Sequence, residues 1–333
     1  MAPNLAIAGV TGAVGKEFLA ILEERDFPFS SIKMLASHRS AGKKIQFKSK
    51  EYTVQEMTKD SFEGVDIALF SAGGSRSKEF APAAVKAGAV VVDNSSAFRM
   101  DPNTPLVIPE VNPEKIAENK GIIANPNCST IIANVPVWPL HKANPIKRMI
   151  VSTYQAASGA GQAAMDELAA QSQEILDGKE PTCNAFPYQI AFNVFSHNAP
   201  MMPNGYNEEE MKMVNETRKI FSCPQIAITC TCIRIPVMRA HCESINLEFT
   251  DPMTPDQVRD LLSTAPGVAL IDDRENNRFP MPIDATDKDP IFVGRIRQDE
   301  SLPENRGINL WVAGDQIKKG AALNAVQIAE KLI

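Results

Sequence analysis

The first part of the chain alternates short apolar segments with helical patterns. Leu5–Ala8 is apolar throughout, and Val14–Arg25 carries apolar residues at helical spacing. Short strands that are apolar on both sides are typical of a parallel sheet covered on both faces. The pattern predicts an α/β fold that begins with a Rossmann-like, doubly wound parallel sheet. Its further strands are predicted at Ile32–Ala36, Asp66–Ala72, Ala89–Asp93 and Gly121–Ala124, with a helix near Ser77–Ala87.

Beyond about residue 143 the pattern changes, because longer strand-like segments appear between helical ones. This pattern of long strands between helices predicts a second domain of the α+β type. Its strands are predicted at Arg148–Gln155, Gln225–Ile235, Glu243–Thr250, Ile291–Arg297 and Asn309–Ala313, and its helices at Gly161–Leu176, Glu208–Phe221 and Pro255–Ala265. The chain ends in an amphipathic helical pattern, Ala321–Ile333.

Length and charge agree with two globular domains. A chain of 333 residues exceeds the roughly 250–300 residues at which single cores stop growing. The formal net charge of −6 argues against a nucleic-acid partner, which requires a basic surface. No apolar run approaches the roughly 20 residues that cross a bilayer, and the N-terminal segment is interpreted as a first strand, not a signal peptide. We therefore expect a cytoplasmic protein with no membrane partner.

The six cysteines are scattered and form no CxxC pair. Cys230 and Cys232 are two residues apart in an apolar, β-branched stretch, so they are expected on one face of a strand as buried structural thiols. No further ligands lie close to them in the sequence, and we predict no metal site.

The turn Gly9-Val10-Thr11-Gly12-Ala13-Val14-Gly15 directly follows the first strand and opens a helix. Glycine lets the backbone approach a pyrophosphate, and the helix N-terminus stabilises the phosphate charge. A tight packing turn is the alternative interpretation. The strand-and-helix context favours a dinucleotide site.

The end of the second strand indicates which dinucleotide binds. An NAD site usually has an acidic residue here that binds the ribose 2′-hydroxyl. This chain has Ser37-His38-Arg39-Ser40 instead, followed by Lys43 and Lys44. Arg39 and the serine hydroxyls suit a 2′-phosphate, which favours NADP, whereas the two lysines are better explained as a solvated basic loop.

Cys128 stands in Asn125-Pro126-Asn127-Cys128-Ser129-Thr130, at a turn from a strand into a helical stretch. A helix N-terminus favours the thiolate, which is the reactive form of cysteine. A lone cysteine is more often a small core residue, but this position favours a nucleophile. Because Pro136 and Pro139 follow, only the first turns of the helix are predicted.

Further polar residues stand at the ends of predicted strands. Gln155 ends a β-branched strand and precedes a loop of small residues, Ala156–Gly161, that allows close approach of a ligand. Arg234 and His241 are seven residues apart across a bend that contains a proline. Arginine can clamp a carboxylate in a bidentate manner. Histidine is a natural acid/base partner of a cysteine, although taken alone His241 would more often be structural.

In order, the segments GVTGAVG, SAGGS, DNSSAFRM, NPNCST, STYQAASGAG, EEEMK, CIRIPVMRAH, FVGRIR and GDQIKKGAALN closely resemble those of bacterial aspartate-semialdehyde dehydrogenases. The resemblance covers nearly the whole chain. It implies NADPH-dependent conversion of L-aspartyl 4-phosphate to L-aspartate 4-semialdehyde and inorganic phosphate, in the biosynthesis of lysine, threonine, methionine and diaminopimelate. It also implies a homodimer or a tetramer of dimers.

The resemblance also implies roles for individual residues. Cys128 would carry the acyl thioester, His241 would act as proton acceptor and Gln155 would take part in catalysis. Gln155 and Arg234 would hold the substrate, with Glu209 near its amino group. Arg99 and Lys212 would bind phosphate. Contacts to NADP would come from Gly9, Thr11, Gly12, Ala13, Val14, Arg39, Ser40, Ser158, Gly159 and Gln316.

These roles define the domains that we expect. Residues 1–127 would form the NADP-binding domain, and residues 128–313 the catalytic and dimerisation domain. The C-terminal segment 314–333 would pack back on the first domain.

Two alternatives remain open at this point. N-acetylglutamyl-phosphate reductases use the same thioester chemistry, but they typically have a glycine before the cysteine and an aromatic residue after it, where this chain has Asn127 and Ser129. The second alternative is a catalytically inactive NADP-binding sensor or scaffold. The joint presence of Cys128, Gln155, Arg234 and His241 argues against it.

Overall fold

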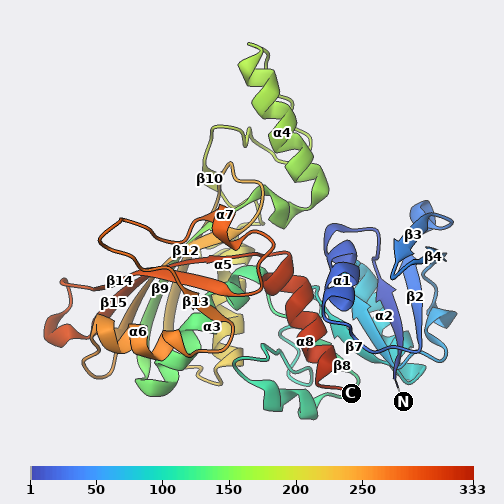
Figure 1. Ribbon diagram of the computed structural model, residues 1–333, viewed down its shortest axis with the longest axis horizontal. Coiled ribbons are helices and arrows are strands. Elements are labelled where there is room, and N and C mark those ends of the chain that lie inside the picture. The colour runs from blue at the N-terminus through green and yellow to red at the C-terminus, as the bar shows by residue number, and fades with distance from the viewer. Residues whose placement is uncertain (1) are drawn as a thin grey trace. The chain divides into compact units, whose positions relative to one another are not determined.

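The computed structural model describes residues 2–333, which form two compact units (Figure 1). The first comprises the chain up to Asn127 together with Ala321–Ile333, and the second comprises Cys128–Gly320. Residues 314–320, which we expected on the first domain, belong to the second unit. They bond to other residues of that unit, because the Asp315 carboxylate pairs with Arg239 at 2.7 Å and Gln316 accepts from the Ala240 N–H at 2.9 Å.

The first unit is built on a six-stranded parallel sheet in the order β5-β2-β1-β6-β7-β8. This confirms the predicted Rossmann-like sheet. The strands are β1 (Asn4–Ala8), β2 (Ser31–Ala36), β5 (Gln55–Glu56), β6 (Ile67–Phe70), β7 (Val90–Asp93) and β8 (Ile122–Ala124), and a separate hairpin is formed by β3 (Lys44–Phe47) and β4 (Lys50–Thr53).

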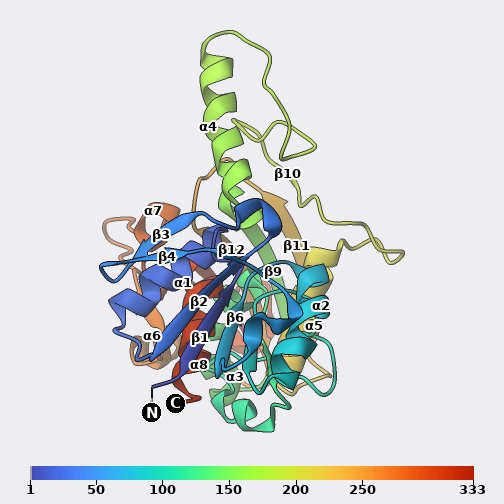
Figure 2. The same ribbon diagram turned by 90° about the vertical axis from the view of Figure 1, so that its right-hand side faces the viewer.

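Helices cover both faces of this sheet (Figure 2). On one face α1 (Ala13–Glu24) and α8 (Asn324–Glu330) pack in a cluster that includes Ile7 of β1. On the other face α2 (Gly74–Lys86) packs in a second cluster that includes Ala6 and Ala8. Successive side chains of a strand point to opposite faces, which explains why the central strands β1 and β6 are apolar on both faces.

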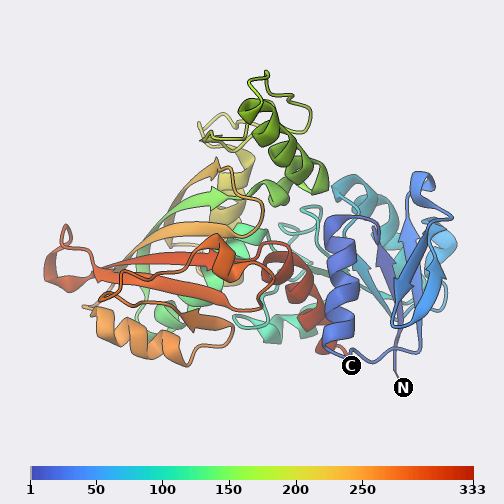
Figure 3. The same cartoon turned by 45° about the horizontal axis from the view of Figure 1, so that its top comes forward.

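The second unit contains a seven-stranded mixed sheet in the order β10-β11-β9-β12-β15-β14-β13. Figure 3 shows long strands of this sheet side by side. Helices α3 (Cys128–Ala143), α5 (Glu208–Ile220) and α6 (Pro255–Ser263) pack on it, α4 (Gln162–Leu176) extends away from it, and α7 (Pro282–Ala285) is short. The strands are β9 (Ile146–Gln155), β10 (Phe195–Ser196), β11 (Ala227–Arg234), β12 (His241–Phe249), β13 (Val268–Leu270), β14 (Ile291–Gln298) and β15 (Gly307–Gly314).

The two faces of this sheet differ in burial. One set of alternate residues, such as Met149, Val151 and Thr153 of β9, is buried. The other set is only half-buried, including Tyr154 and its neighbour Trp311 of β15, whose rings lie 5.2 Å apart. The second face therefore remains partly open to a partner or to solvent.

Helix α3 is longer than the sequence suggested, because it continues through Pro136 and Pro139 to Ala143. Each proline removes a backbone donor from the helix. Most side chains of the helix are buried, and this packing offsets the lost hydrogen bonds. Over residues 2–333, no helix has the length and apolar character that a membrane crossing requires.

Candidate active site

Three predicted site residues stand at one edge of the mixed sheet. Gln155 ends β9, and Arg234 ends the parallel neighbour β11 directly opposite it in register. His241 begins β12, which runs antiparallel to β9 on its other side. Parallel strands end at the same edge where an antiparallel neighbour begins, so the topology alone brings the three residues together.

Cys128 is the first residue of α3 and is partly exposed. The next residue, Ser129, is buried and accepts a hydrogen bond of 3.0 Å from the Gln155 amide. This contact links the start of α3 to the sheet edge. The helix N-terminus offers a positive electrostatic environment that favours a thiolate.

The amide of Gln155 has a defined orientation. Its Nε2 donates to Ser129 and, at 3.2 Å, to Glu209 at the start of α5. The reversed amide would place an oxygen against the Glu209 carboxylate, which is repulsive. The Gln155 Oε1 atom is buried and has no hydrogen-bond partner among the described residues, so it remains able to accept one from a ligand.

Glu209 also forms an ion pair with Lys212, with 3.0 Å between the carboxylate and the Nζ atom. Both residues lie in the first turns of α5, where a capping box formed by Asn207 and Glu210 fixes the helix start. The site therefore holds an acidic and a basic group side by side, as a zwitterionic ligand would require.

The Arg234 guanidinium is almost completely buried. Its Nη1 donates to the Ala156 carbonyl at 3.1 Å, and its Nη2 lies 2.8 Å from Nε2 of His197. Phe186 lies beneath it, with 5.8 Å between Cζ and the ring centroid. Burial lowers the pKa of the guanidinium, while the Glu209 carboxylate and the Cys128 thiol act in the opposite direction.

His241 is fully buried. Its Nδ1 accepts a hydrogen bond of 3.0 Å from the backbone N–H of Ala156, and its Nε2 has no protein partner within residues 2–333. Burial lowers the pKa of the imidazole well below its ordinary value, and the positive charge of Arg234 adds to this effect. The ring is therefore neutral near pH 7.

Gly159 lies close against Arg234 and His241. A Cβ atom at Gly159 would lie 2.9 Å from Arg234 Nη1 and 3.1 Å from His241 Nε2, so a larger residue would displace the guanidinium or the ring. The neighbouring Ser158 hydroxyl is hydrogen-bonded to the Gln316 amide, and Gln316 also accepts from the backbone N–H of Ala240 at 2.9 Å. Ser158, Gly159 and Gln316 thus lie close to the loop that carries His241.

In the first unit, the predicted phosphate-binding turn has the expected geometry. Gly9 has a φ of +90°, and a Cβ atom there would collide with the backbone of Ser71. The N-cap of α1 is Gly12, which has no side chain to occupy the first N–H groups of the helix, and the first turn contains no acidic residue. The turn therefore fits the diphosphate of a dinucleotide.

The loop after β2 lies beside this turn, since Thr11 donates to the Ser40 hydroxyl at 3.4 Å. Arg39 is exposed, and no ion pair or hydrogen bond involves its side chain over residues 2–333. Its guanidinium is available to a phosphate group.

The predicted phosphate-binding pair is divided between the units. Arg99 belongs to the first unit, where it is buried and donates to the carbonyls of Asn125 at 2.9 Å and Asn94 at 3.0 Å. Lys212 belongs to the second unit. The other predicted residues divide in the same way. Gly9, Thr11, Gly12, Ala13, Val14, Arg39 and Ser40 lie in the first unit, and Cys128, Gln155, Ser158, Gly159, Glu209, Arg234, His241 and Gln316 lie in the second.

The sequence did not point to His197 or Ser129 as members of the site. His197 follows the two-residue strand β10, which is too short to give a periodic signal. The one feature of the sequence that could have drawn attention to His197 is that histidine is rare in this chain, with four in 333 residues.

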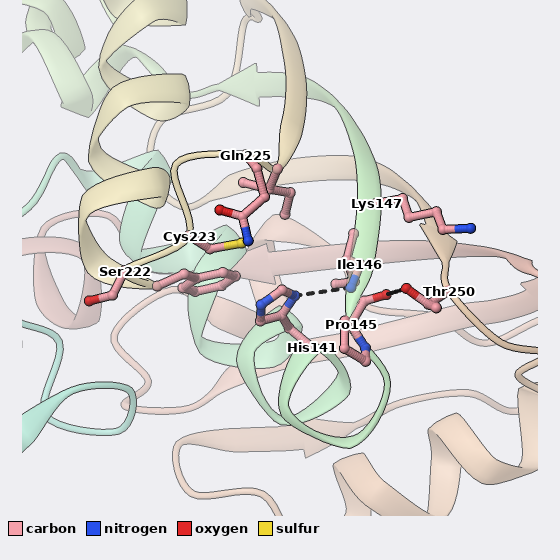
Figure 4. A pocket seen from close by; sticks show the side chains of 10 residues that line it. His141, Pro145, Ile146, Lys147, Ser222, Cys223, Gln225 and Thr250 are labelled. Atoms are coloured by element: carbon pink, nitrogen blue, oxygen red, sulfur yellow. Dashed lines mark hydrogen bonds between the residues drawn. The ribbon is translucent and has the colours of Figure 1, made fainter.

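A pocket of about 610 Å³ lies at the other ends of α3, β9 and α5 (Figure 4). It is lined by the end of α3, the start of β9 and the loop after α5, including His141, Ile146, Phe221 and Cys223. The His141 ring accepts from the Ile146 N–H at 3.0 Å and stacks on Phe221. None of the predicted site residues lines this pocket.

Within residues 2–333, no group of three or more His, Cys, Asp or Glu side chains is arranged to hold a metal ion. Cys230 and Cys232 are buried, and burial raises the pKa of both thiols. They are therefore unreactive.

Two family descriptions match the chain. "Semialdehyde dehydrogenase, NAD binding domain" matches residues 4–119, and "Semialdehyde dehydrogenase, dimerisation domain" matches residues 137–319. The fold and site thus define a two-domain dehydrogenase with an NAD(P)-binding domain and a dimerisation domain.

Individual relatives narrow this class. The chain is 55% identical to an aspartate-semialdehyde dehydrogenase of Synechocystis over 99% of this chain and 97% of the relative. It is 50% identical to one of Bacillus subtilis over 99% and 97%. The crystal structure of aspartate semialdehyde dehydrogenase II from Vibrio cholerae superimposes with a TM-score of 0.96, at 49% identity, over 100% of this chain and 98% of that chain.

The chain belongs to the aspartate-semialdehyde dehydrogenase family. It is accordingly an oxidoreductase of aspartate-family amino-acid biosynthesis. This membership excludes the N-acetylglutamyl-phosphate reductase alternative.

Proposed function

We propose that the chain reduces L-aspartyl 4-phosphate to L-aspartate 4-semialdehyde with NADPH, through a thioester on Cys128. The observation that carries the proposal is the cluster at the sheet edge, where Gln155 is hydrogen-bonded to the residue after Cys128 and stands opposite Arg234. The solved Vibrio cholerae relative that is 48% identical was determined in complex with ASA, which supports the choice of substrate.

Cys128 is the nucleophile of the first step. Its thiolate attacks the acyl carbon of the substrate, the C–S bond forms, and the bond to the phosphate oxygen breaks. The thioester that remains accepts hydride more readily than a carboxylate does, so one difficult step becomes two easier ones.

The substrate has three charged groups, and the proposed site has a partner for each. Arg234 binds the α-carboxylate as a fork. Glu209 lies near the amino group, and the Gln155 amide holds the acyl portion. Arg99 and Lys212 bind the phosphate that leaves in this direction and attacks in the reverse one.

The residues of the first unit fit NADP. Gly9, Gly12 and the turn from Thr11 to Val14 hold the diphosphate, and Arg39 with Ser40 binds the 2′-phosphate. Ser158, Gly159 and Gln316 of the second unit contact the remainder of the cofactor. When bound, the reduced nicotinamide supplies the hydride. His241 takes up the proton of the Cys128 thiol as the thiolate forms, and returns it to the sulfur as the C–S bond breaks and the aldehyde leaves.

The proposed assembly is a homodimer, with a tetramer of dimers as the alternative. The half-buried face of the mixed sheet, with its Tyr154–Trp311 ring pair, is the surface on which a second copy would pack. Light scattering of the purified protein tests this assembly.

The decisive experiment measures NADP reduction with aspartate semialdehyde in the presence and absence of inorganic phosphate. Activity should require phosphate, because phosphate must attack the thioester in this direction. Propionaldehyde, which lacks the amino and carboxylate groups, serves as the control substrate. Equal rates with and without phosphate would contradict the proposed reaction.

A further inference from the structure

The His197 ring lies against the guanidinium of Arg234 because of backbone pairing. His197 follows β10, which runs antiparallel to the end of β11, where Phe195 stands opposite Arg234. The backbone N–H of His197 donates to the Cys232 carbonyl at 2.9 Å. This extends the pairing by one residue and brings the imidazole Nε2 to 2.8 Å from Arg234 Nη2.

The guanidinium is thereby held on three sides. The Ala156 carbonyl binds Nη1, His197 binds Nη2, and Phe186 lies beneath the plane. The Nε atom is buried and has no hydrogen-bond partner within residues 2–333. Because Nη2 carries two hydrogens, one can bind His197 while the other joins the Nε hydrogen in a side-on fork for a carboxylate.

The segment that supplies His197 and Phe186 is itself anchored. Glu167 of α4 accepts hydrogen bonds from the backbone N–H groups of Asn184 at 2.5 Å, Ala185, and Phe186 at 3.0 Å. Gln171, one turn later on the same helix, accepts from the N–H groups of Ile190 and Ala191. The loop that carries Phe186 is therefore fixed on a buried polar side of α4.

His197 can accept from Arg234 only while its ring is neutral. Burial and the charge of Arg234 on β11 lower the pKa of His197 to about 4. Glu209 and Lys212 on α5 also face the ring, and their charges act in opposite directions. The ring therefore stays neutral across the physiological range.

A second donor competes for the same ring. The Ala199 N–H lies 3.1 Å from Nδ1, and a neutral imidazole can accept at one nitrogen only. The contact from Arg234 is shorter and charge-assisted, so it is the stronger one. The ring should accept at Nε2 and carry its hydrogen on Nδ1.

We propose that His197 is a positioning residue that turns the Nε–Nη2 edge of Arg234 toward the α-carboxylate of the substrate. The inference rests on the proposed role of Arg234 in binding that carboxylate. His197 need not touch the substrate. It sets the angle of the fork, and with it the selectivity for substrates that carry a carboxylate at this distance from the aldehyde.

Two variants at this position test the role through kinetics. His197→Leu removes the acceptor, whereas His197→Gln can place a carbonyl oxygen near the position of Nε2. The leucine variant should raise the KM for aspartate semialdehyde about tenfold, as expected for loss of one charge-assisted hydrogen bond, with a smaller change in kcat and an unchanged KM for NADP. The glutamine variant should restore most of the substrate affinity. A wild-type KM in the leucine variant, or no recovery with glutamine, would overturn the inference.

A double-mutant cycle separates this inference from the proposed function. Arg234→Lys keeps the charge but loses the fork, so the substrate KM should rise, and adding His197→Leu should change it little further. A normal KM in Arg234→Lys would refute the role of Arg234 itself. If Arg234→Lys raises the substrate KM as expected, but His197→Leu raises it further by the same factor as in the wild-type protein, only the role of His197 is refuted.

A spectroscopic test does not depend on activity or on the folding of a variant. In protein labelled with 15N-histidine, the His197 signals should show an unprotonated Nε2 and a protonated Nδ1 near neutral pH. The opposite tautomer would mean that Ala199 holds the ring and that His197 does not orient Arg234.

Discussion

The backbone N–H of Ala156 donates a hydrogen bond of 3.0 Å to Nδ1 of His241. A neutral imidazole that accepts at Nδ1 carries its hydrogen on Nε2. The Nε2 atom is the one that lacks a partner in the described part of the chain. In this tautomer Nε2 donates a hydrogen bond to a bound group, and it can take up a proton only after the hydrogen of the ring moves to Nδ1.

We expect His241→Asn to lower kcat by roughly 10²–10⁴-fold, the usual contribution of a positioned acid/base group. The KM for aspartate semialdehyde should change much less, since Arg234 and Glu209 remain in place. Steady-state kinetics with saturating NADP give both numbers. His141→Asn is the matched control, because it makes the same substitution at a half-buried histidine that lines the distant pocket. A kcat in His241→Asn close to that of the control would contradict the assignment.

Cys128→Ala should abolish turnover while NADPH still binds, because the Gly9–Gly15 turn is unchanged. Acyl phosphate added without NADPH should leave an aspartyl adduct on the Cys128 peptide in wild type and none in the variant, as mass spectrometry can measure. Appreciable activity in Cys128→Ala would refute the thioester mechanism.

Alkylation rates give an independent measure of the same thiol. Burial raises the pKa of Cys242 to about 12, and Cys230, Cys232 and Cys223 are also buried. Cys183 is the exposed competitor, so the comparison is made in a Cys183→Ser background as well. Cys128 should react fastest because a helix N-terminus favours its thiolate, and bound substrate should protect it. Faster labelling of Cys183 than of Cys128 would argue against an activated nucleophile.

The sequence identified the residues that strand ends bring together. Gln155 ends a recognisable β-branched strand, and Arg234 and His241 flank the proline-containing bend between two other strands. The strand patterns and this bend were sufficient to place the three residues. Long strands give such signals because each residue contributes to the same period of two. The parallel sheet of the first unit was predictable for the same reason.

Other parts of the site depend on packing that the sequence does not display. His197 reaches Arg234 through β10, which has two residues, and Ser129 contributes through a hydroxyl contact with Gln155. Helix α3 passes through two prolines because it is buried, which overrides local propensity. The segment 314–320 stays with the second unit through side-chain contacts, such as the Arg239–Asp315 ion pair and the bond between Gln316 and the Ala240 N–H. Each of these is a tertiary effect.

Cofactor preference should depend on Arg39. Arg39→Ala should raise the KM for NADPH and leave that for NADH nearly unchanged, because only NADPH carries the 2′-phosphate that the guanidinium would bind. Lys43→Ala is the matched control, since Lys43 is a nearby exposed cation with no proposed contact. Initial rates with both cofactors provide the test. Equal losses with NADPH and NADH in Arg39→Ala would refute the assignment.

Glu243 is fully buried on β12 beside Thr153. Neither carboxyl oxygen has a hydrogen-bond partner among residues 2–333, and burial raises the pKa of Glu243 well above its ordinary value. The folded protein therefore keeps a proton that the unfolded chain loses. As the pH rises, the free energy of unfolding should therefore fall by about 1.4 kcal/mol per pH unit. The fall begins just above the pKa of Glu243 in the unfolded chain and ends at its pKa in the folded protein.

Glu243→Gln should remove this dependence, because the amide has nearly the same shape and does not ionise. Urea denaturation at about pH 5 and about pH 8 should show similar stability of variant and wild type at the lower pH and a more stable variant at the higher one. Glu210→Gln is the control of opposite sign. The Glu210 carboxylate accepts from the N–H groups of Asn207 at 2.9 Å and Cys232 at 3.0 Å, so its replacement should destabilise the protein at both values. If Glu243→Gln is the less stable protein at the higher pH, Glu243 is ionised and paired in solution, and its carboxyl group is not neutral.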